Sequence, residues 1–590
     1  MSKKITLKFK SKPVQNVQIG DLVKCRDFKH NITTVKTVHT VFTPTIKHHN
    51  QYTITLANNL QLTGSNIHPV WCKKITGETT WVEMQYLDVG DSLFTDGDVW
   101  IEISDISLNG IEDKTFFDFT VGDHHNYYAG KDGKFILSHN SATCHFPFWH
   151  YEIEDIVVLK NNGGTEDNRV RHMDYSIQFS KVFYERFMKD EMLTLFSPNE
   201  VPDLYNAFGK LEFDELYVKY EQDCSIKYKR KISAKRLMAL YVKERIETGR
   251  IYAMNIDHCN EYSPWTEHVT MSNLCQEILQ PTKPLNHIDD ADAEIGICIL
   301  SALNLLEIKD DTDLTATCDI VVRMLDELID YQLFFNTAAE NFTKKRRSLG
   351  IGITNLAALL AKNNLKYTDQ ETPNFVDSWM EKIQYNLIKS SVELAKERGP
   401  CEKFNLTKYS QGILPIDSYK KKVDAVVTRK PSLDWEQLRQ QVLTHGMRHS
   451  TLTALMPCES SSTIQCSTNG IEPVRSLMTY KASKASTIPV LVPNYATCKN
   501  KYTLAYDMPD NTGMINIIAA LQKWVDMSIS ANLYYNYDHY PNRALPDAVV
   551  IKDLLYAYSM GVKTLYYSNT SDGDKQSADG GNCTSGACSI

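Results

Sequence analysis

The heptapeptide Ser272-Asn-Leu-Cys-Gln-Glu-Ile278 places an amide, a thiol and a carboxylate at alternating positions, Asn273, Cys275 and Glu277. In an extended or looped segment such side chains project to one side, so the three groups would meet. A carboxylate so close to a thiol opposes formation of a thiolate, which argues against a thiolate nucleophile. On spacing alone, a buried cysteine in a loop is the better explanation.

The sequence around this heptapeptide has an α/β pattern from about residue 145 onward. Apolar residues at helical spacing, separated by short apolar strands such as Ile295–Leu300 and Thr564–Tyr567, favour this class. The periodicity predicts helices over residues 179–194, 234–248, 313–333, 370–398, 434–445 and 514–532.

The first 140 residues have a different character. They contain eight of the 17 histidines, and their short β-branched and aromatic runs are separated by turn residues. Runs such as 53–56, 98–103, 116–121 and 133–137 are typical of strands, and no helix-length periodic segment precedes residue 145. An all-β segment followed by an α/β segment is therefore expected.

Length, charge and cysteine content limit the classes of protein to which this chain can belong. The chain has 590 residues, enough for roughly three to five domains. A net charge of −8 without charge runs argues against a nucleic-acid arm or a membrane-surface patch. The N-terminus lacks a signal peptide, and no run reaches the roughly 18 apolar residues of a membrane span. The 14 cysteines are thinly spread, so we expect a reducing, cytoplasmic compartment.

The boundary between the two segments reads Phe135-Ile-Leu-Ser-His-Asn-Ser141. An Asn side chain can attack its own carbonyl and cleave the next peptide bond, with a neighbouring His moving the proton and the following Ser acting as nucleophile. Alone, the tripeptide His139-Asn140-Ser141 does not indicate cleavage, since an ordinary polar loop would also explain it.

Three further stretches give the boundary a context. They are Val17-Gln-Ile-Gly-Asp-Leu-Val23, Ser65-Asn-Ile-His68 and Phe117-Asp-Phe-Thr-Val-Gly-Asp-His-His125. In this order they resemble the blocks of the Hint fold of inteins, with Ser65 in place of the usual threonine. The resemblance implies the splicing residues His68, Asp118, His125, His139, Asn140 and Ser141.

In the intein family, His68 would polarise the upstream scissile amide, and Asp118 and His125 would support transfer and Asn cyclisation. Inteins begin with a Cys or Ser nucleophile and a short strand, whereas Met1-Ser2-Lys3 leads almost directly into what resembles the second strand. We therefore expect residues 1–140 to be the C-terminal piece of a split intein.

Residues 141–590 resemble the large subunit of class I ribonucleotide reductase. The motifs that match, in order, are Leu159–Tyr175, Gly249–Tyr252, Ser272–Ile278, Pro281–Leu285, Met456–Ser461, Thr468–Pro473, Gly561–Tyr567 and Cys583–Cys588. The resemblance implies an incomplete ten-stranded α/β barrel with a finger loop over residues 141–570, and a flexible redox tail over residues 571–590.

The resemblance also implies roles. Cys275 would be the transient thiyl radical that takes the ribose 3′ hydrogen, Glu277 the base on the 3′-hydroxyl, and Asn273 a substrate partner beside Leu274. A neutral hydrogen-atom donor needs no lowered pKa, which removes the objection raised by the nearby carboxylate. Cys298 would be one of two thiols that reduce the 2′ position.

Tyr566 and Tyr567 would relay the radical from a partner subunit to Cys275. Adjacent strand residues face opposite ways, so their stacking requires a local bend. Cys583 and Cys588 would reduce the active-site disulfide again and exchange with thioredoxin or glutaredoxin. No metal is expected on this chain, since two cysteines without a nearby His do not make a zinc site.

The segment Pro457-Cys-Glu-Ser-Ser461 would bind the substrate diphosphate through hydroxyls and backbone N–H groups, helped by a helix start. Cys458 replaces the small hydroxyl residue usual in the family. Residues expected to contact substrate here are Pro457, Cys458, Glu459, Ser460 and Ser461. The start of the barrel, with the partner thiol of Cys298, and most nucleotide-effector elements lie upstream of Ser141 in this family.

The sequence therefore predicts a precursor that splices in trans at Asn140–Ser141. Splicing would join Ser141 to a separate N-terminal fragment. The joined product would reduce ribonucleoside diphosphates together with a metal-containing small subunit that supplies the radical, as a dimer of large subunits. An alternative is that residues 1–140 no longer splice and instead hold two reductase fragments together. A secreted Hint autoprotease is disfavoured by the Asn140 ending.

Overall fold

The computed structural model describes residues 22–571 with gaps. In the first part it describes residues 22–27, 32–42, 45–46, 50–57, 61–65, 69–76, 79–95, 99–111, 114–115, 118–121, 126–131 and 134–139. From residue 143 to 571 it omits residues 164–168, 172, 288–289, 291, 298, 335 and 483–486. The chain divides into two compact units. The first holds Met1–Ser141, His287–Asp290 and Leu333–Thr337, and the second holds Ala142–Asn286, Ala291–Gln332 and Ala338–Ile590.

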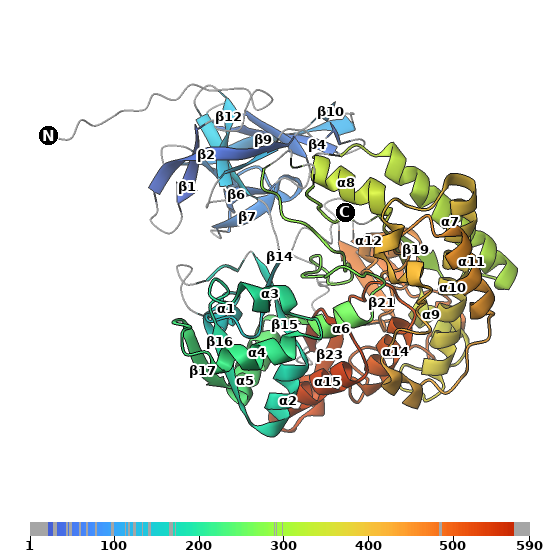
Figure 1. Ribbon diagram of the computed structural model, residues 1–590. Coiled ribbons are helices and arrows are strands. Elements are labelled where there is room, and N and C mark those ends of the chain that lie inside the picture. The colour runs from blue at the N-terminus through green and yellow to red at the C-terminus, as the bar shows by residue number, and fades with distance from the viewer. Residues whose placement is uncertain are drawn as a thin grey trace. The chain divides into compact units, whose positions relative to one another are not determined.

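The described part of the first unit is built from antiparallel strands (Figure 1). They are β1 (Leu22–Asp27), β2 (Ile32–Phe42), β3 (Thr45–Ile46), β4 (Asn50–Leu56), β5 (Gln61–Ser65), β6 (Pro69–Lys73), β7 (Thr79–Glu83), β8 (Ser92–Thr95), β9 (Val99–Ile111), β10 (Lys114–Thr115), β11 (Asp118–Val121), β12 (Asn126–Lys131) and β13 (Lys134–His139). The largest sheet has the order β12-β13-β6-β8-β9-β4-β5, with β7 on β6. Ile54, Leu56, Val70, Cys72 and Ile103 are fully buried in its core.

The second unit contains all the α-helices that the structure describes. They are α1 (Ile153–Val157), α2 (Lys181–Lys189), α3 (Pro202–Ala207), α4 (Phe213–Gln222), α5 (Ala234–Thr248), α6 (Ile256–Glu261), α7 (Asp311–Tyr331), α8 (Thr337–Arg346), α9 (Leu356–Lys362), α10 (Thr372–Arg398), α11 (Trp435–His445), α12 (Glu459–Ile464), α13 (Tyr495–Cys498), α14 (Thr512–Gln522) and α15 (Asp547–Ser559).

The strands of the second unit are short. They are β14 (Thr143–Pro147), β15 (Asp174–Phe179), β16 (Met192–Phe196), β17 (Lys229–Ser233), β18 (Ile251–Asn255), β19 (Ile299–Asn304), β20 (Leu349–Thr354), β21 (Met478–Ala482), β22 (Thr487–Leu491), β23 (Leu533–Asn536), β24 (Thr564–Leu565) and β25 (Ser568–Ser571). β14, β15 and β18 are parallel, and β24 is antiparallel to β18.

Backbone hydrogen bonds join these strands into one open array. Beyond β24, the N–H of Tyr566 donates to the carbonyl of Ala531 at 2.7 Å, and residues 528–531 pair with Leu455 in parallel. The segment 451–455 then pairs with β20, and β20 pairs with β19 in parallel. Within the described residues the array runs from β14 to β19 without closing, so the ten strands of the expected incomplete barrel stay a prediction.

Three predicted elements need correction. Helix α2 ends at Lys189 rather than residue 194, because Asp190 adopts a left-handed conformation with φ 58° and β16 follows. Helix α14 ends at Gln522 rather than residue 532, and residues 528–531 run extended through the core. The strand predicted over 295–300 begins at Ile299.

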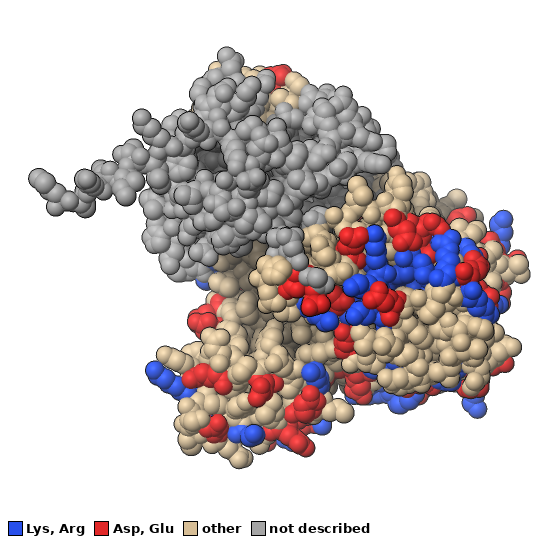
Figure 2. Space-filling model, turned by 45° about the horizontal axis from the view of Figure 1, so that its top comes forward, with Lys and Arg blue, Asp and Glu red and all other residues tan. Residues whose placement is uncertain are grey.

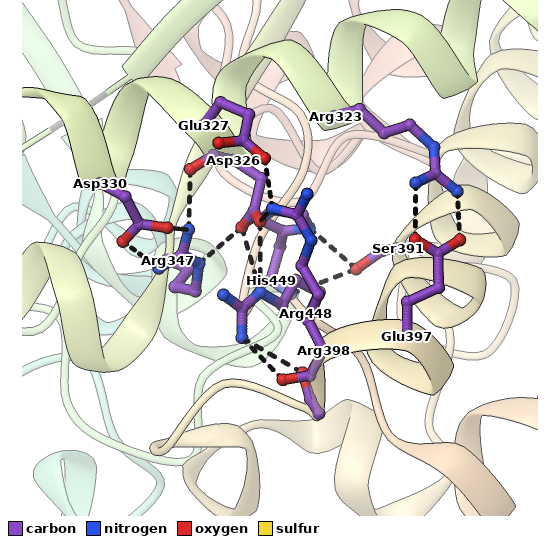
Figure 3. A network of polar contacts seen from close by, with 11 residues as sticks. Arg323, Asp326, Glu327, Asp330, Arg347, Ser391, Glu397, Arg398, Arg448 and His449 are labelled. Carbon is purple, nitrogen blue, oxygen red and sulfur yellow. Dashed lines mark hydrogen bonds and ion pairs between the residues drawn. The ribbon is translucent and has the colours of Figure 1, made fainter.

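A buried ionic network ties α7 to α10 and to the segment that leads into residues 451–455 (Figure 3). The fully buried carboxylate of Asp326 accepts from Arg347 at 2.6 Å, Arg398 at 3.1 Å and Arg448 at 3.2 Å, and lies 3.2 Å from a ring nitrogen of His449. The pKa of Asp326 is lowered below its ordinary value by His449 and Arg347, which outweigh its burial. One carboxylate thus holds three arginines and a histidine from three places in the chain: the residue after α8, the end of α10 and the segment just before residue 451.

Acidic and basic side chains are intermixed on the described surface shown in Figure 2. On α7 and α10 they form ion pairs such as Arg323–Glu397 at 2.6 Å and Lys382–Asp311 at 2.7 Å. Such exposed pairs contribute about 0–1 kcal/mol each. In the described residues, none of the helices has the length and apolar character needed to cross a bilayer.

Candidate active site

The heptapeptide around Cys275 forms a tight loop that is hydrogen-bonded to strands of the open array. Ser272 and Leu279 pair across its base, and the side chain of Asn273 accepts from the backbone N–H of Ile278 at 3.0 Å. Gln276 adopts φ 72°, a conformation that turns the chain and is uncommon for a residue with a side chain. Gln276 accepts from Ser176 of β15 at 2.9 Å, which fixes the loop to the sheet.

Cys275 lies against a tyrosine pair. Its thiol is 8% exposed and its sulfur lies 3.4 Å from the hydroxyl of Tyr566, which donates to it. The Tyr566 and Tyr567 hydroxyl oxygens are 2.7 Å apart, and their ring centroids are 3.8 Å apart. The strand β24 ends at Leu565 and β25 starts at Ser568, so the chain has the break that lets adjacent tyrosine rings pack together, here tilted by 33° to each other.

Glu277 is buried within the same loop. Its carboxylate accepts from the hydroxyl of Ser530 at 3.0 Å, and that hydroxyl is also 2.7 Å from the carbonyl of Cys275. Burial raises the pKa of Glu277, and hydrogen bonds from Asn273 and Ser530 only partly oppose the shift. A carboxyl of this kind can accept a proton near neutral pH more readily than an ordinary glutamate.

The segment from Pro457 to Ser461 precedes and begins α12, as the diphosphate hypothesis anticipated. The N–H of Cys458 donates to the side chain of Asn469 at 2.7 Å, and Asn469 donates to Glu459 at 3.2 Å. The pKa of the Cys458 thiol is raised to about 12 by burial and then by the nearby Glu277 and Glu472 carboxylates. Backbone hydrogen bonds bring the two segments to one site: the N–H of Leu455, just before α12, donates to the carbonyl of Ser528 at 3.0 Å, and the N–H of Ser528 donates to the carbonyl of Glu277 at 2.9 Å. The side chain of Ser460 lies outside the described residues.

Sequence reasoning missed several polar residues of this site. Ser530 contacts Glu277, and Asn532 contacts both the N–H of Tyr567 at 3.0 Å and the carboxylate of Glu472. Tyr534 donates to Glu472 at 2.7 Å. A signal was present: Ser528, Ser530 and Asn532 alternate along an extended segment, and Glu472 belongs to the Thr468–Pro473 motif.

Some predicted residues cannot be placed. Cys298, Cys583 and Cys588 lie outside the described residues, as does the tail beyond Ser571. The splicing residues His68, His125, Asn140 and Ser141 also lie outside them.

Among the splicing residues, Asp118 is the first residue of β11 and His139 the last of β13. β13 pairs at Ser138 with Val70 of β6 and at His139 with Asn126 of β12. The chain just after His68, just after His125 and just before Asn140 therefore converges in one sheet. Asp118 belongs to a separate sheet with β1 and β2.

Comparison with known proteins gives a separate family match for each of the two units. The family model for the ribonucleotide reductase barrel domain matches residues 139–568. The second unit thus belongs to the ribonucleotide reductase family. A Hint model, described as the pretoxin HINT domain, matches residues 8–141. The chain is therefore a Hint domain followed by a reductase barrel domain.

Curated relatives agree with the reductase assignment. The chain is 48% identical over 457 residues to the ribonucleoside-diphosphate reductase subunit alpha of Haemophilus influenzae, which covers 76% of this chain and 60% of the relative. It is 47% identical to the reductase 1 subunit alpha of Escherichia coli, covering 76% and 61%, and 42% identical to the subunit alpha of Enterobacteria phage T4, covering 73% and 58%. The chain spans about 60% of the length of these relatives.

Proposed function

We propose that this chain is a trans-splicing precursor whose second unit supplies the C-terminal part of a class I ribonucleotide reductase large subunit. The observation that supports it best is the run of contacts from Tyr567 through Tyr566 to the Cys275 sulfur, in a chain of this family. The substrates would be ribonucleoside diphosphates, as the relatives' names suggest.

The residues of the site suit a radical reaction. A phenoxyl radical on Tyr566 would take the hydrogen atom of the Cys275 thiol, which restores the phenol and leaves a thiyl radical. The thiyl radical would remove the ribose 3′ hydrogen, while Glu277 accepts the proton of the 3′-hydroxyl. Cys298 and a partner thiol would supply two electrons and two protons, release the 2′-hydroxyl as water, and close to a disulfide.

The remaining components come from outside the described site. Cys583 and Cys588 would reduce that disulfide by exchange and then be reduced by thioredoxin or glutaredoxin. A metal-containing small subunit would supply the radical, and effector nucleotides would bind mainly to the N-terminal fragment. The assembled large subunit would form a cytoplasmic dimer.

Splicing is tested by intact mass. Co-expression with the N-terminal intein and reductase fragment is expected to give a ligated product that lacks residues 1–140. Asn140→Ala should abolish this product, and Asn162→Ala, an asparagine outside the junction, should not. If the mass of the chain never changes but the two fragments co-purify and reduce nucleotides, the first unit holds fragments together without splicing.

A further inference from the structure

One buried lysine lies close to the Cys275 loop and has no part in the reaction described above. Lys563 directly precedes β24, and its side chain is fully buried. Its ammonium group donates to the backbone carbonyls of Val525 at 3.4 Å, Asp526 at 2.9 Å and Met527 at 2.6 Å. A buried ammonium is costly unless its three donors are satisfied, and these three carbonyls satisfy them.

The three carbonyls belong to the connection between α14 and the extended segment 528–531, which borders the site. The N–H of Ser528 donates to the carbonyl of Glu277 at 2.9 Å, so this segment holds the loop that contains the thiol. The N–H of Tyr566 donates to the carbonyl of Ala531 at 2.7 Å, so the same segment holds the phenol. The ammonium therefore fixes the start of a segment to which both reacting groups are attached.

The strand that follows Lys563 contacts the loop directly. The hydroxyl of Thr564 donates to the carbonyl of Gln276 at 3.0 Å, and the hydroxyl of Tyr566 donates to the sulfur of Cys275 at 3.4 Å. The chain that begins at Lys563 thus contacts the loop, while the Lys563 side chain holds the neighbouring segment against it. A shift of either segment would change the distance between the phenol oxygen and the sulfur.

We infer that Lys563 is a positioning residue for the hydrogen-atom transfer between Tyr566 and Cys275, because its ammonium group holds residues 525–527 and so sets the spacing of the two reacting groups. The inference rests on the proposed function, since it takes this transfer to be a step of the reaction. The side chain of Lys563 acts through backbone carbonyls and not on the reacting atoms. A misplacement of about 1 Å can lower the rate of such a step by about 100-fold.

The protonation state of Lys563 should also affect the rate. An ammonium group has three donors for the three carbonyls, whereas a neutral amine has two donors and a lone pair that repels the third oxygen. Burial lowers the pKa of Lys563 to about 7, so this change falls near neutral pH. The other titratable groups that face the ammonium are Cys259 of α6, Asp526 and Lys408. Burial raises the pKa values of Cys259 and Asp526 and lowers that of Lys408, so a variant of Lys563 itself is needed to assign the effect.

Amide hydrogen exchange of the full chain tests the positioning without catalysis. In Lys563→Met, the amides of Ser528 and Tyr566 should exchange at least about tenfold faster than in the wild type, because the segment between them is released. Lys523→Met is the matched control, since Lys523 is also buried but its ammonium lies 3.2 Å from the carboxylate of Asp377. The control should leave both amides unchanged. Unchanged exchange in Lys563→Met would overturn the inference.

Kinetics of the assembled enzyme test the effect on the reaction. In Lys563→Met, kcat for ribonucleoside diphosphate reduction should fall at least about tenfold while KM changes less than about twofold, since transfer is slowed and binding is not. Deuterium at the 3′ carbon should slow this variant more than the wild type, because hydrogen transfer then limits turnover. Lys563→Gln can still donate to two carbonyls, so it should keep the fold and more activity than Lys563→Met. Lys523→Met should keep the wild-type kcat.

The pH profile assigns the effect to the ammonium group. The wild-type kcat should fall as pH rises through about 7, and Lys563→Gln should lack this fall. The inference would be overturned by a normal kcat in Lys563→Met, by an equal loss of kcat in Lys523→Met, or by an alkaline fall that persists in Lys563→Gln. A wild-type assembly without turnover would instead reject the proposed function, and amide exchange would still decide whether Lys563 holds the segment.

Discussion

The hydroxyl of Tyr566 donates to the sulfur of Cys275 at 3.4 Å, across 291 residues of sequence. The contact depends on two local features, the positive φ of Gln276 and the break between β24 and β25. The thiol and the phenol belong to two separate motifs, and only the folded chain brings their reactive atoms together.

Removal of the Tyr566 hydroxyl should stop turnover. Tyr566→Phe keeps the ring but removes the hydrogen-atom carrier between Tyr567 and Cys275, so nucleotide reduction by the assembled enzyme should fall to background. The measurement is deoxynucleotide formation with the small subunit present. Tyr217→Phe is a matched control, since its buried hydroxyl bonds the backbone of Thr194; it should retain activity and lose about 1 kcal/mol of stability. Turnover by Tyr566→Phe near the normal rate would reject the relay.

The raised pKa of Glu277 should appear in the pH dependence. If Glu277 is the base, activity should fall at low pH with an apparent pKa above that of an ordinary glutamate. Glu277→Gln should have low activity, and its pH profile should lack this fall at low pH. The unfolding free energy provides an independent measurement. Because the pKa of Glu277 is raised in the folded state, the free energy of unfolding of the wild type should fall as pH rises through that pKa. The stability of Glu277→Gln should therefore increase relative to wild type over the same range.

Lys563 should make the fold more stable in alkali. Its ammonium group is fully buried and donates to the carbonyls of Asp526 at 2.9 Å and Met527 at 2.6 Å, and burial lowers its pKa to about 7. The unfolded chain therefore binds more protons between about pH 7 and 10.5, and the wild type should gain stability over that window.

Urea unfolding of Lys563→Met and wild type at several pH values checks this. From pH 7 to 10.5, the free energy of unfolding of the wild type should rise relative to that of the variant by up to roughly 3–5 kcal/mol, since one pKa unit corresponds to about 1.4 kcal/mol. Lys552→Met, at an exposed position on α15, is the matched control for the loss of a lysine. A constant difference for Lys563→Met would mean that the pKa is not lowered.

The network around Asp326 should be essential for stability (Figure 3). Asp326→Ala leaves Arg347, Arg448 and His449 without their shared carboxylate, and breaking a buried pair costs about 3–5 kcal/mol. Asp319→Ala is the control on the same helix, because Asp319 is half exposed and its pair with Arg323 is worth about 0–1 kcal/mol. Equal unfolding midpoints for the two variants would show that the network has no net effect.

Elements with clear boundary signals were predictable. Helices α5 and α11 begin and end within a residue of the prediction, since each is amphipathic and ends at a glycine, Gly249 and Gly446. The helix predicted over 514–532 was too long because an apolar run does not distinguish a buried helix from a buried strand. In the second half of that run Ser528, Ser530 and Asn532 bond across the core rather than along a helix.

The sequence by itself determined the two-part organisation, the families of the two parts and the motif that contains Cys275, because these depend on local residue order. Tertiary structure alone decided that Ser530, Asn532 and Glu472 join the site and that Tyr566 contacts the Cys275 sulfur. Each of these depends on pairing between segments far apart in the chain. Spacing along a sequence carries no information about such pairing, since it is set by the packing of the whole unit.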